Sequence, residues 1–233
     1  MKKIVLFFIF FIISCREKPD FEKDYVIYPA NPKTENIGFY WKNNAGQILK
    51  NIGNLKKEVE TENKKLKFAM NGGMFEINNF PKGLYIENFK TLNEIDTLTG
   101  EGNFYIQPNG IFYLTKSNDS EIVETKKFQK NANIKYATQS GPMLLMNGKI
   151  NPVFQEQSKN LNIRNGVGIL EDGNIVFAMS KKEINFYKFA LFFKKMGCKS
   201  ALYLDGFVSK TYLPEKNWIQ EDGDFGVIIA ITE

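Results

Sequence analysis

Four short glycine-containing motifs hold the residues of this chain that could do chemistry. They are Ala-Met-Asn-Gly-Gly-Met-Phe (69–75), Gln-Ser-Gly-Pro (139–142), Arg-Asn-Gly-Val-Gly-Ile (164–169) and Leu-Tyr-Leu-Asp-Gly (202–206). In each motif a polar or charged residue stands where an apolar run meets glycine, which is typical of a buried strand ending in a tight turn. Side chains at such strand ends are held rigidly, as catalytic groups must be. We therefore expect one site that contains Asn71, Gln139, Ser140, Arg164 and Asp205.

Arg164 and Asp205 are the charged residues of these motifs. Asp205 follows Ala-Leu-Tyr-Leu, so its carboxylate is expected at the edge of the core, where an unpaired charge is costly and pKa values are perturbed. Arg164 is expected to project from a strand end, where a guanidinium suits bidentate binding of phosphate or carboxylate. The structural alternatives are a turn at Asp205-Gly206 and an ion pair between Arg164 and Asp205.

The uncharged motifs also allow two interpretations. Asn71-Gly72-Gly73 either lets a ligand approach the backbone closely or forms an ordinary tight turn. Gln139-Ser140-Gly141-Pro142 either presents two hydrogen-bonding side chains at the rim of a site or makes a structural turn.

The chain has no histidine, which narrows the possible chemistry. A Ser-His-Asp relay, a Cys-His pair and an imidazole-ligated zinc site are all excluded. Any general acid or base is therefore expected to be a carboxylate. The sequence requires no cofactor; an Mg²⁺ or Ca²⁺ ion would need oxygen ligands, and Asp222 and Asp224 look more like part of a polar turn than a ligand set.

The N-terminus predicts export and anchoring. Residues 1–14 read as a signal peptide, with Lys2 and Lys3 before an apolar run over 4–13 that is too short to span a bilayer. The pair Ser14-Cys15 resembles the lipobox of bacterial lipoproteins. We expect a lipidated Cys15, a tether over 15–24 and a membrane-anchored protein of the bacterial cell envelope, facing the periplasm or the exterior.

Composition indicates one domain over residues 25–233. The chain is 43% hydrophobic and contains 21 Phe, which suffices for one sizeable core. Its formal charge of +5 falls to +3 without Lys2 and Lys3 (5 − 2 = 3), and the lysines are scattered, which argues against nucleic acid as a partner. Cys198 lies between an apolar helix and a strand, and is expected to be a buried small hydrophobe.

The hydrophobic periodicity predicts an α+β fold built on a mixed, largely antiparallel sheet with two covering helices. The helices are expected over 47–60 and from Asn185 to Gly197, capped by Asn185 and ended by Gly197. The pairs Asn109-Gly110, Asn147-Gly148 and Asp172-Gly173 predict β-hairpins. Strands are expected over 25–28, 37–42, 67–70, 201–204 and 225–231.

Taken together, the four motifs resemble the phosphodiester glycosidase family from about Asn71 to Ile231. This family includes the animal uncovering enzyme, which releases N-acetylglucosamine from phosphodiesters, and secreted bacterial proteins associated with exopolysaccharide. Phe207 stands where the animal enzymes carry a further glycine, and the cysteine-rich modules of the animal enzyme are missing. The resemblance implies a hydrolase of sugar-1-phosphodiesters in envelope or exopolysaccharide metabolism. The competing class is a non-catalytic glycan-binding envelope lipoprotein.

The resemblance supplies the positions of the site residues, and chemistry suggests their roles. Expelling a phosphate from a sugar C1 needs little proton donation, so one carboxylate and one arginine suffice in principle, unlike the two carboxylates of ordinary glycosidases. Asp205 would be the nucleophile or general base, Arg164 would hold the phosphate, and Glu76 is a possible second carboxylate. The substrate contacts are expected from Asn71, Gly72, Gly73, Gln139, Ser140, Gly141, Asn165, Gly206 and Ser209.

Overall fold

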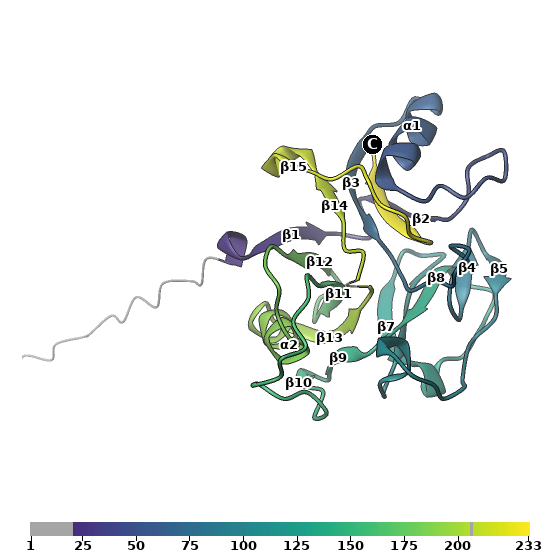
Figure 1. Cartoon of the computed structure of the whole chain (residues 1–233). Helices are drawn as coiled ribbons and strands as arrows, with labels where there is room; N and C mark the ends of the chain where they lie inside the picture. The colour runs from purple at the N-terminus through teal and green to yellow at the C-terminus, as the bar shows by residue number, and fades with distance from the viewer. Residues whose placement is uncertain (1–20, 206) are drawn as a thin grey trace, which may run out of the picture.

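The structure is a computed structural model that describes residues 21–205 and 207–233 (Figure 1). Three antiparallel sheets hold its named strands. The first sheet has the order β1 (Tyr25–Ala30), β12 (Ile175–Ser180), β11 (Asn165–Leu170), β13 (Cys198–Tyr203), β9 (Met143–Met146) and β10 (Lys149–Ile150). The second has β15 (Trp218–Ile219), β14 (Thr211–Leu213), β3 (Leu66–Asn71), β16 (Ile228–Thr232) and β2 (Asn36–Tyr40). The third has β5 (Lys90–Asn93), β4 (Tyr85–Glu87), β8 (Ile134–Ser140), β6 (Gly110–Thr115) and β7 (Ser120–Glu124).

The three sheets enclose one core. Their inward side chains pack together and include Phe39 and Phe68 of the second sheet, Phe112 of the third and Phe177 of the first. Phe68 stacks on Phe177 with ring centroids 5.3 Å apart. Because every strand of the first two sheets alternates between this core and an outer face, the outer faces need cover of their own.

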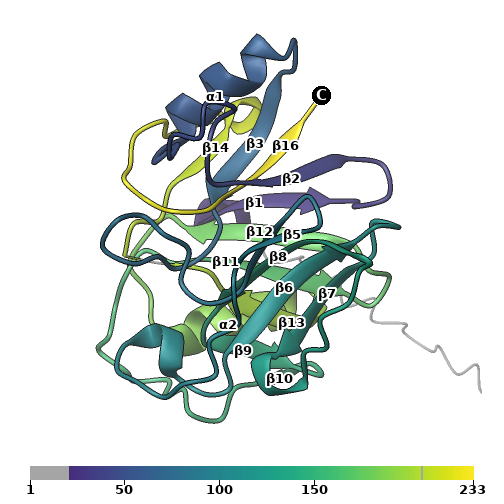
Figure 2. The ribbon, with the colours of Figure 1, turned by 90° about the vertical axis from the view of Figure 1, so that its right-hand side faces the viewer.

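The two helices supply that cover. Helix α1 (Ile52–Thr61) begins at the cap Asn51, whose side chain accepts a hydrogen bond from Asn54 N, and it packs on the second sheet in one apolar cluster, hereafter the α1 layer. Figure 2 shows α1 at one end of the molecule. Helix α2 (Phe186–Lys195), capped by Asn185, packs on the first sheet in a second cluster, the α2 layer. None of the described helices is long and apolar enough to cross a membrane.

The α+β fold with two helices is therefore confirmed, and the strands divide among three sheets. The hairpins predicted at Asn147-Gly148 and Asp172-Gly173 join β9 to β10 and β11 to β12. The hairpin predicted at Asn109-Gly110 is wrong, because Gly110 is already the first residue of β6. Asn109 instead donates a hydrogen bond from Nδ2 to the carbonyl of Phe104, which ties the preceding loop to the strand. The first helix begins later than predicted, at Ile52.

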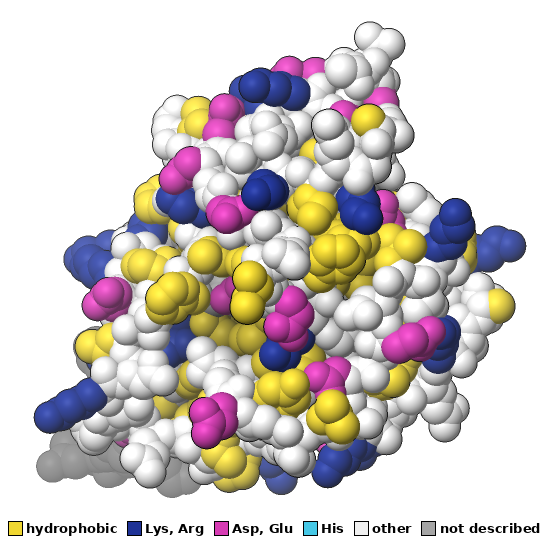
Figure 3. Space-filling view, turned by 45° about the vertical axis from the view of Figure 1, so that its right-hand side comes forward, with side chains coloured by type: hydrophobic (Ala, Val, Ile, Leu, Met, Phe, Trp, Pro, Cys, Tyr) yellow, Lys and Arg dark blue, Asp and Glu magenta, His cyan; other side chains and the backbone are white. Residues whose placement is uncertain are grey.

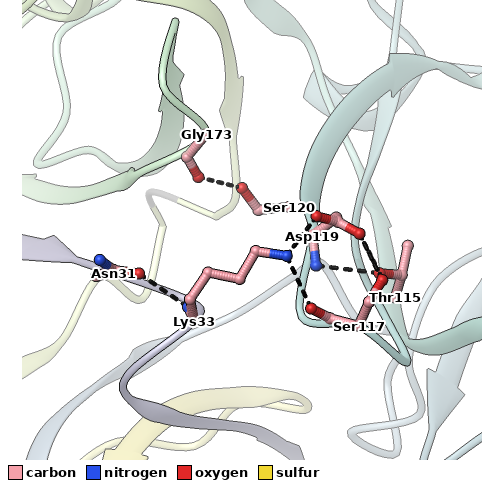
Figure 4. Close-up of polar contacts among 7 residues, drawn as sticks. All are labelled: Asn31, Lys33, Thr115, Ser117, Asp119, Ser120 and Gly173. Atoms are coloured by element: carbon pink, nitrogen blue, oxygen red, sulfur yellow. Dashed lines mark hydrogen bonds and ion pairs between the residues drawn. The ribbon is translucent and has the colours of Figure 1, made fainter.

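Loops from different sheets are fastened to one another away from the four motifs (Figure 4). Lys33, in the β1–β2 turn, donates to Asp119 Oδ1 at 2.5 Å and to the carbonyl of Ser117 at 2.8 Å in the β6–β7 hairpin. Ser120 Oγ donates to the carbonyl of Gly173 in the β11–β12 hairpin at 2.7 Å. The hydrogen bonds that Asp119 accepts from Lys33, first, and from the Ser117 and Thr115 side chains lower its pKa to about 2.

The four motifs lie where the three sheets meet. Asn71 ends β3 of the second sheet, Ser140 ends β8 of the third, and Arg164 and Asp205 flank β11 and β13 of the first. Since β11 and β13 are antiparallel, with Gly166 opposite Tyr203, the start of one and the end of the other share an edge. Apolar side chains gather over the middle of the face of the molecule shown in Figure 3.

Candidate active site

Asp205 has a buried carboxyl group with no cationic partner among the described residues. Its side chain is only 9% exposed, and its Oδ1 accepts one hydrogen bond, from the backbone N–H of Phe207 at 3.2 Å. Burial removes water from the charged form and raises the pKa of Asp205 to about 7, an effect that the Phe207 N–H partly opposes. A carboxyl group with this pKa exchanges protons readily at neutral pH, which is the property a general base or acid requires.

A network of two asparagines fixes the backbone on which Asp205 sits. Asn165 Oδ1 accepts a hydrogen bond from Asp205 N at 2.9 Å, and Asn165 Nδ2 donates to Asn71 Oδ1 at 2.9 Å and to the Asn71 carbonyl at 2.8 Å. Asn71 Nδ2 in turn donates to the carbonyl of Asp205 at 3.0 Å. Both asparagines are fully buried. Their hydrogen-bonding groups are used to connect two sheets and to set the position of Asp205.

Two serines extend this network. Ser140 Oγ donates to the carbonyl of Leu204, so that the third sheet is joined to the same strand end. Ser209 Oγ donates to the carbonyl of Asp205 at 3.0 Å. Asn71 Oδ1 also accepts from Lys210 N at 2.9 Å. The side chains of Asn71, Ser140, Asn165 and Ser209 thus hold the backbone of Leu204 and Asp205 in place.

Arg164 is fully buried and most of its guanidinium is already engaged. Nε donates to the carbonyl of Ile184 at 2.8 Å, and Nη2 donates to the carbonyl of Asn160 at 2.9 Å. The guanidinium carbon lies 3.7 Å from the ring centroid of Phe186 and 5.4 Å from that of Tyr203. Nη1 has no hydrogen-bond partner among the described residues. Two of the three guanidinium nitrogens are therefore used within the protein, and the third, Nη1, is itself buried.

Arg164 and Asp205 lie just outside the paired ends of β11 and β13. Tyr203, the last residue of β13, packs in the α2 layer, whereas Leu204 packs in the central core. Phe186, which contacts Arg164, belongs to the α2 layer too. The alternative of an ion pair is not realised in the described residues, because neither group contributes to the pKa shift of the other. Burial lowers the pKa of Arg164, an effect that Tyr203 opposes.

The glycines of the motifs make room for the protein itself. A Cβ on Gly72 would lie 2.6 Å from Ile229 Cγ1, one on Gly73 would collide with Thr138 Oγ1, and one on Gly141 would lie 2.7 Å from Asn109 Cβ. A Cβ on Gly166, in β11, would lie 2.8 Å from the carbonyl oxygen of Leu202. At these positions the missing Cβ allows close packing between segments of the chain, and the substrate contacts expected from Gly72, Gly73 and Gly141 stay predictions. Gly206 lies outside the described residues.

Two expected substrate contacts lie apart from this network. Gln139 is fully buried; its Oε1 accepts from Leu84 N and from Asp96 N, both at 2.9 Å, and its Nε2 donates to the Asp96 carbonyl at 2.6 Å. Gln139 therefore fastens the loop after β5 to β8. Glu76 is exposed and pairs with Lys82 at 3.0 Å, so it is not a second buried carboxylate beside Asp205.

A pocket of about 240 Å³ adjoins Arg164. Two of its lining residues, Asn160 and Phe186, contact the Arg164 guanidinium, and the others include Ile106, Phe154 and Ser158. Within residues 21–205 and 207–233, no group of three or more His, Cys, Asp or Glu side chains could hold a metal ion. Asp222 pairs with Lys210 at 2.7 Å, and Asp224 accepts a hydrogen bond from Asn79 Nδ2.

Sequence reasoning missed the aromatic residues of the site. The motif predicts Tyr203 only as part of an apolar strand, and the periodicity predicts Phe186 only as part of an apolar helix. A signal for Tyr203 was present, because side chains two residues apart on a strand share a face, which places Tyr203 beside Asp205. No local signal connects Phe186 or Asn160 with Arg164.

Comparison with known proteins assigns the chain to a protein family. The sequence profile of the phosphodiester glycosidase family matches residues 64–227, which include all four motifs. The chain is a phosphodiester glycosidase family member. It is 39% identical over 187 residues to the uncharacterized protein YigE of Escherichia coli K12, a match that covers 80% of this chain and 73% of YigE.

Solved structures of low sequence identity share the fold. The catalytic domain of zebrafish N-acetylglucosamine-1-phosphodiester alpha-N-acetylglucosaminidase, auto-inhibited by its pro-peptide, superposes with a TM-score of 0.57 at 14% identity and covers 90% of this chain and 88% of its own. A putative exported protein of Burkholderia pseudomallei gives a TM-score of 0.58 at 10% identity, covering 89% of this chain and 73% of its own. These matches confirm the α+β fold of the family.

Proposed function

We propose that this family member hydrolyses the bond between a sugar C1 and a phosphate oxygen in a sugar-1-phosphodiester, and that Asp205 is the reacting carboxyl group. The observation that carries the proposal is the buried carboxyl of Asp205, which has no cationic partner among the described residues and whose pKa burial raises to about 7. A structural carboxylate would normally be paired when buried. An unpaired one, rigidly held beside an unpartnered arginine nitrogen, suits catalysis.

The proposed reaction needs one proton transfer. The ionised Asp205 takes a proton from water while the water oxygen bonds to C1, and the C1–oxygen bond breaks so that its electron pair leaves with the phosphomonoester. Alternatively, the carboxylate bonds to C1 first and water then hydrolyses the glycosyl ester. Both routes use the ionised carboxylate, and both give a free sugar and a phosphomonoester.

Arg164 supports this reaction with one hydrogen bond. Nη1 is its remaining donor, and the carbonyls of Ile184 and Asn160 together with the ring of Phe186 hold the guanidinium in place. A positive charge in a buried site interacts strongly with the negative charge that develops on the leaving phosphate. The pocket beside Arg164 then offers space for the group esterified to that phosphate.

The test is hydrolysis of a panel of sugar-1-phosphodiesters in ¹⁸O-labelled water. The proposal predicts free sugar that carries ¹⁸O and phosphomonoester that does not, because the bond to C1 breaks. Label in the phosphate would show phosphodiesterase chemistry and contradict the proposal. Binding of these compounds without any turnover would favour the competing class, a glycan-binding protein.

We also propose that the protein works at the cell envelope, in glycan or exopolysaccharide metabolism, anchored through a lipid on Cys15. The support is the sequence of the first fifteen residues; Cys15 lies outside the described part of the chain. Growth with a fatty-acid analogue is expected to label the wild type and not Cys15→Ala. Equal labelling of both would contradict the anchor.

A further inference from the structure

Phe207 is a large apolar side chain displayed beside the candidate carboxylate. It is 92% exposed, whereas most Phe residues of the described chain are buried. Its backbone N–H donates to Asp205 Oδ1 at 3.2 Å, so its Cα lies close to the carboxyl group. Any molecule that reacts at Asp205 therefore comes within reach of the Phe207 ring.

The exposure of Phe207 follows from a loop that is fixed on both sides. The Asp205 carbonyl accepts hydrogen bonds from Asn71 Nδ2 and Ser209 Oγ, and Lys210 N donates to Asn71 Oδ1. The next side chain, Val208, packs into the α1 layer. With Val208 anchored inward, the loop holds Phe207 away from the core. The exposed Phe207 ring is thereby left free to pack against a ligand that occupies the site.

The loop of Phe207 and Arg164 contact different layers of the molecule. Val208 joins the α1 layer, whereas Arg164 stacks on Phe186 of the α2 layer. A sugar-1-phosphodiester whose C1 is at Asp205 and whose phosphate reaches Arg164 therefore extends its sugar ring toward the loop of Phe207.

We infer that the Phe207 ring stacks on the sugar ring of the substrate and selects which glycosyl group the site accepts. A pyranose has a face of C–H groups that packs on an aromatic ring as other apolar surfaces do. A sugar with an axial hydroxyl on that face fits less well. The inference rests on the proposed function for the placement of the sugar.

The experiment measures binding of sugar 1-phosphates directly, by titration calorimetry on the full chain, and is independent of turnover. The variants are Phe207→Ala and Phe207→Trp. The control is Ile219→Ala, which removes another exposed apolar side chain, 59% exposed, from β15. Phe207→Ala is expected to weaken binding about three- to tenfold, in line with the loss of one aromatic contact. Phe207→Trp and Ile219→Ala are expected to bind within about twofold of the wild type.

Kinetics on any phosphodiester that the wild type cleaves give a second measurement. Phe207→Ala is expected to raise KM and to leave kcat within about threefold, because stacking acts on ground and transition state alike. Equal binding by wild type and Phe207→Ala overturns the inference and leaves the proposed function standing. Binding that depends on Phe207, without cleavage of any phosphodiester, refutes the proposed function and supports the stacking. If the wild type binds no sugar 1-phosphate, the inference fails, and the hydrolysis of the phosphodiester panel alone decides the proposed function.

Discussion

Replacing Asp205 with asparagine is expected to stabilise the folded protein at alkaline pH. The pKa of this carboxyl group is raised from 3.8 to about 7 by burial, a shift of about 3 units, or about 4 kcal/mol at 1.36 kcal/mol per unit. The folded state therefore binds more protons than the unfolded state between pH 4 and pH 7, and the free energy of unfolding falls as pH rises through that window. An amide carries no charge, so Asp205→Asn does not suffer this loss.

Urea unfolding of both proteins at pH 5, 6, 7 and 8 measures the effect. The advantage of Asp205→Asn over wild type should grow by about 1.4 kcal/mol per pH unit up to pH 7 and then level off. The control is Asp222→Asn, whose exposed carboxylate has a pKa that Lys210 lowers, so its removal gives no such gain. An advantage that is independent of pH would refute the reasoning, because it would mean that Asp205 is not desolvated in the folded state.

Three further results are expected. The pH profile of kcat/KM should rise about tenfold per unit below pH 7 and level off above it, since the ionised Asp205 reacts; a profile that falls above pH 7 would make Asp205 a general acid. Arg164→Lys should lower kcat/KM by roughly ten- to hundredfold, because an ammonium cannot keep the Ile184 and Asn160 carbonyl bonds and also reach the phosphate; full activity in a folded variant would place the phosphate elsewhere. Asn165→Ala should lower the free energy of unfolding, measured in urea, by about 2 kcal/mol, because it leaves the buried Asp205 N–H unpaired. No change in this free energy would show that the hydrogen bond is dispensable.

The positions of the motifs were predictable because the relevant signals are local. An apolar run that meets a polar residue and glycine marks the end of a buried strand, and β3, β8 and β13 do end at or just before Asn71, Ser140 and Asp205. Because the chain has no histidine, a carboxylate was the expected acid or base. The desolvation of Asp205 was predictable because this residue follows an apolar run. The helix caps Asn51 and Asn185 show the same local logic, although only the second was expected.

The direction of each polar group was not predictable, because it depends on contacts between distant segments. Asn71 and Asn165 are 94 residues apart and bond to each other, which turns two expected substrate contacts into supports for Asp205. The Arg164 guanidinium donates hydrogen bonds to the carbonyls of Asn160 and Ile184. Neither residue belongs to a motif that predicts this contact. Gln139 and Ser140 are neighbours that point to opposite faces of β8, as strand alternation requires, so only Ser140 joins the network at Asp205.

The most direct test of the central claim compares sugar release by wild type and Asp205→Asn from the same sugar-1-phosphodiester, with folding checked on the same samples. The account predicts a folded variant whose rate falls by several orders of magnitude, as loss of a nucleophile or general base requires, while the Asp222→Asn control keeps the wild-type rate. A folded Asp205→Asn variant that releases sugar at the wild-type rate would remove Asp205 from the mechanism and contradict the account.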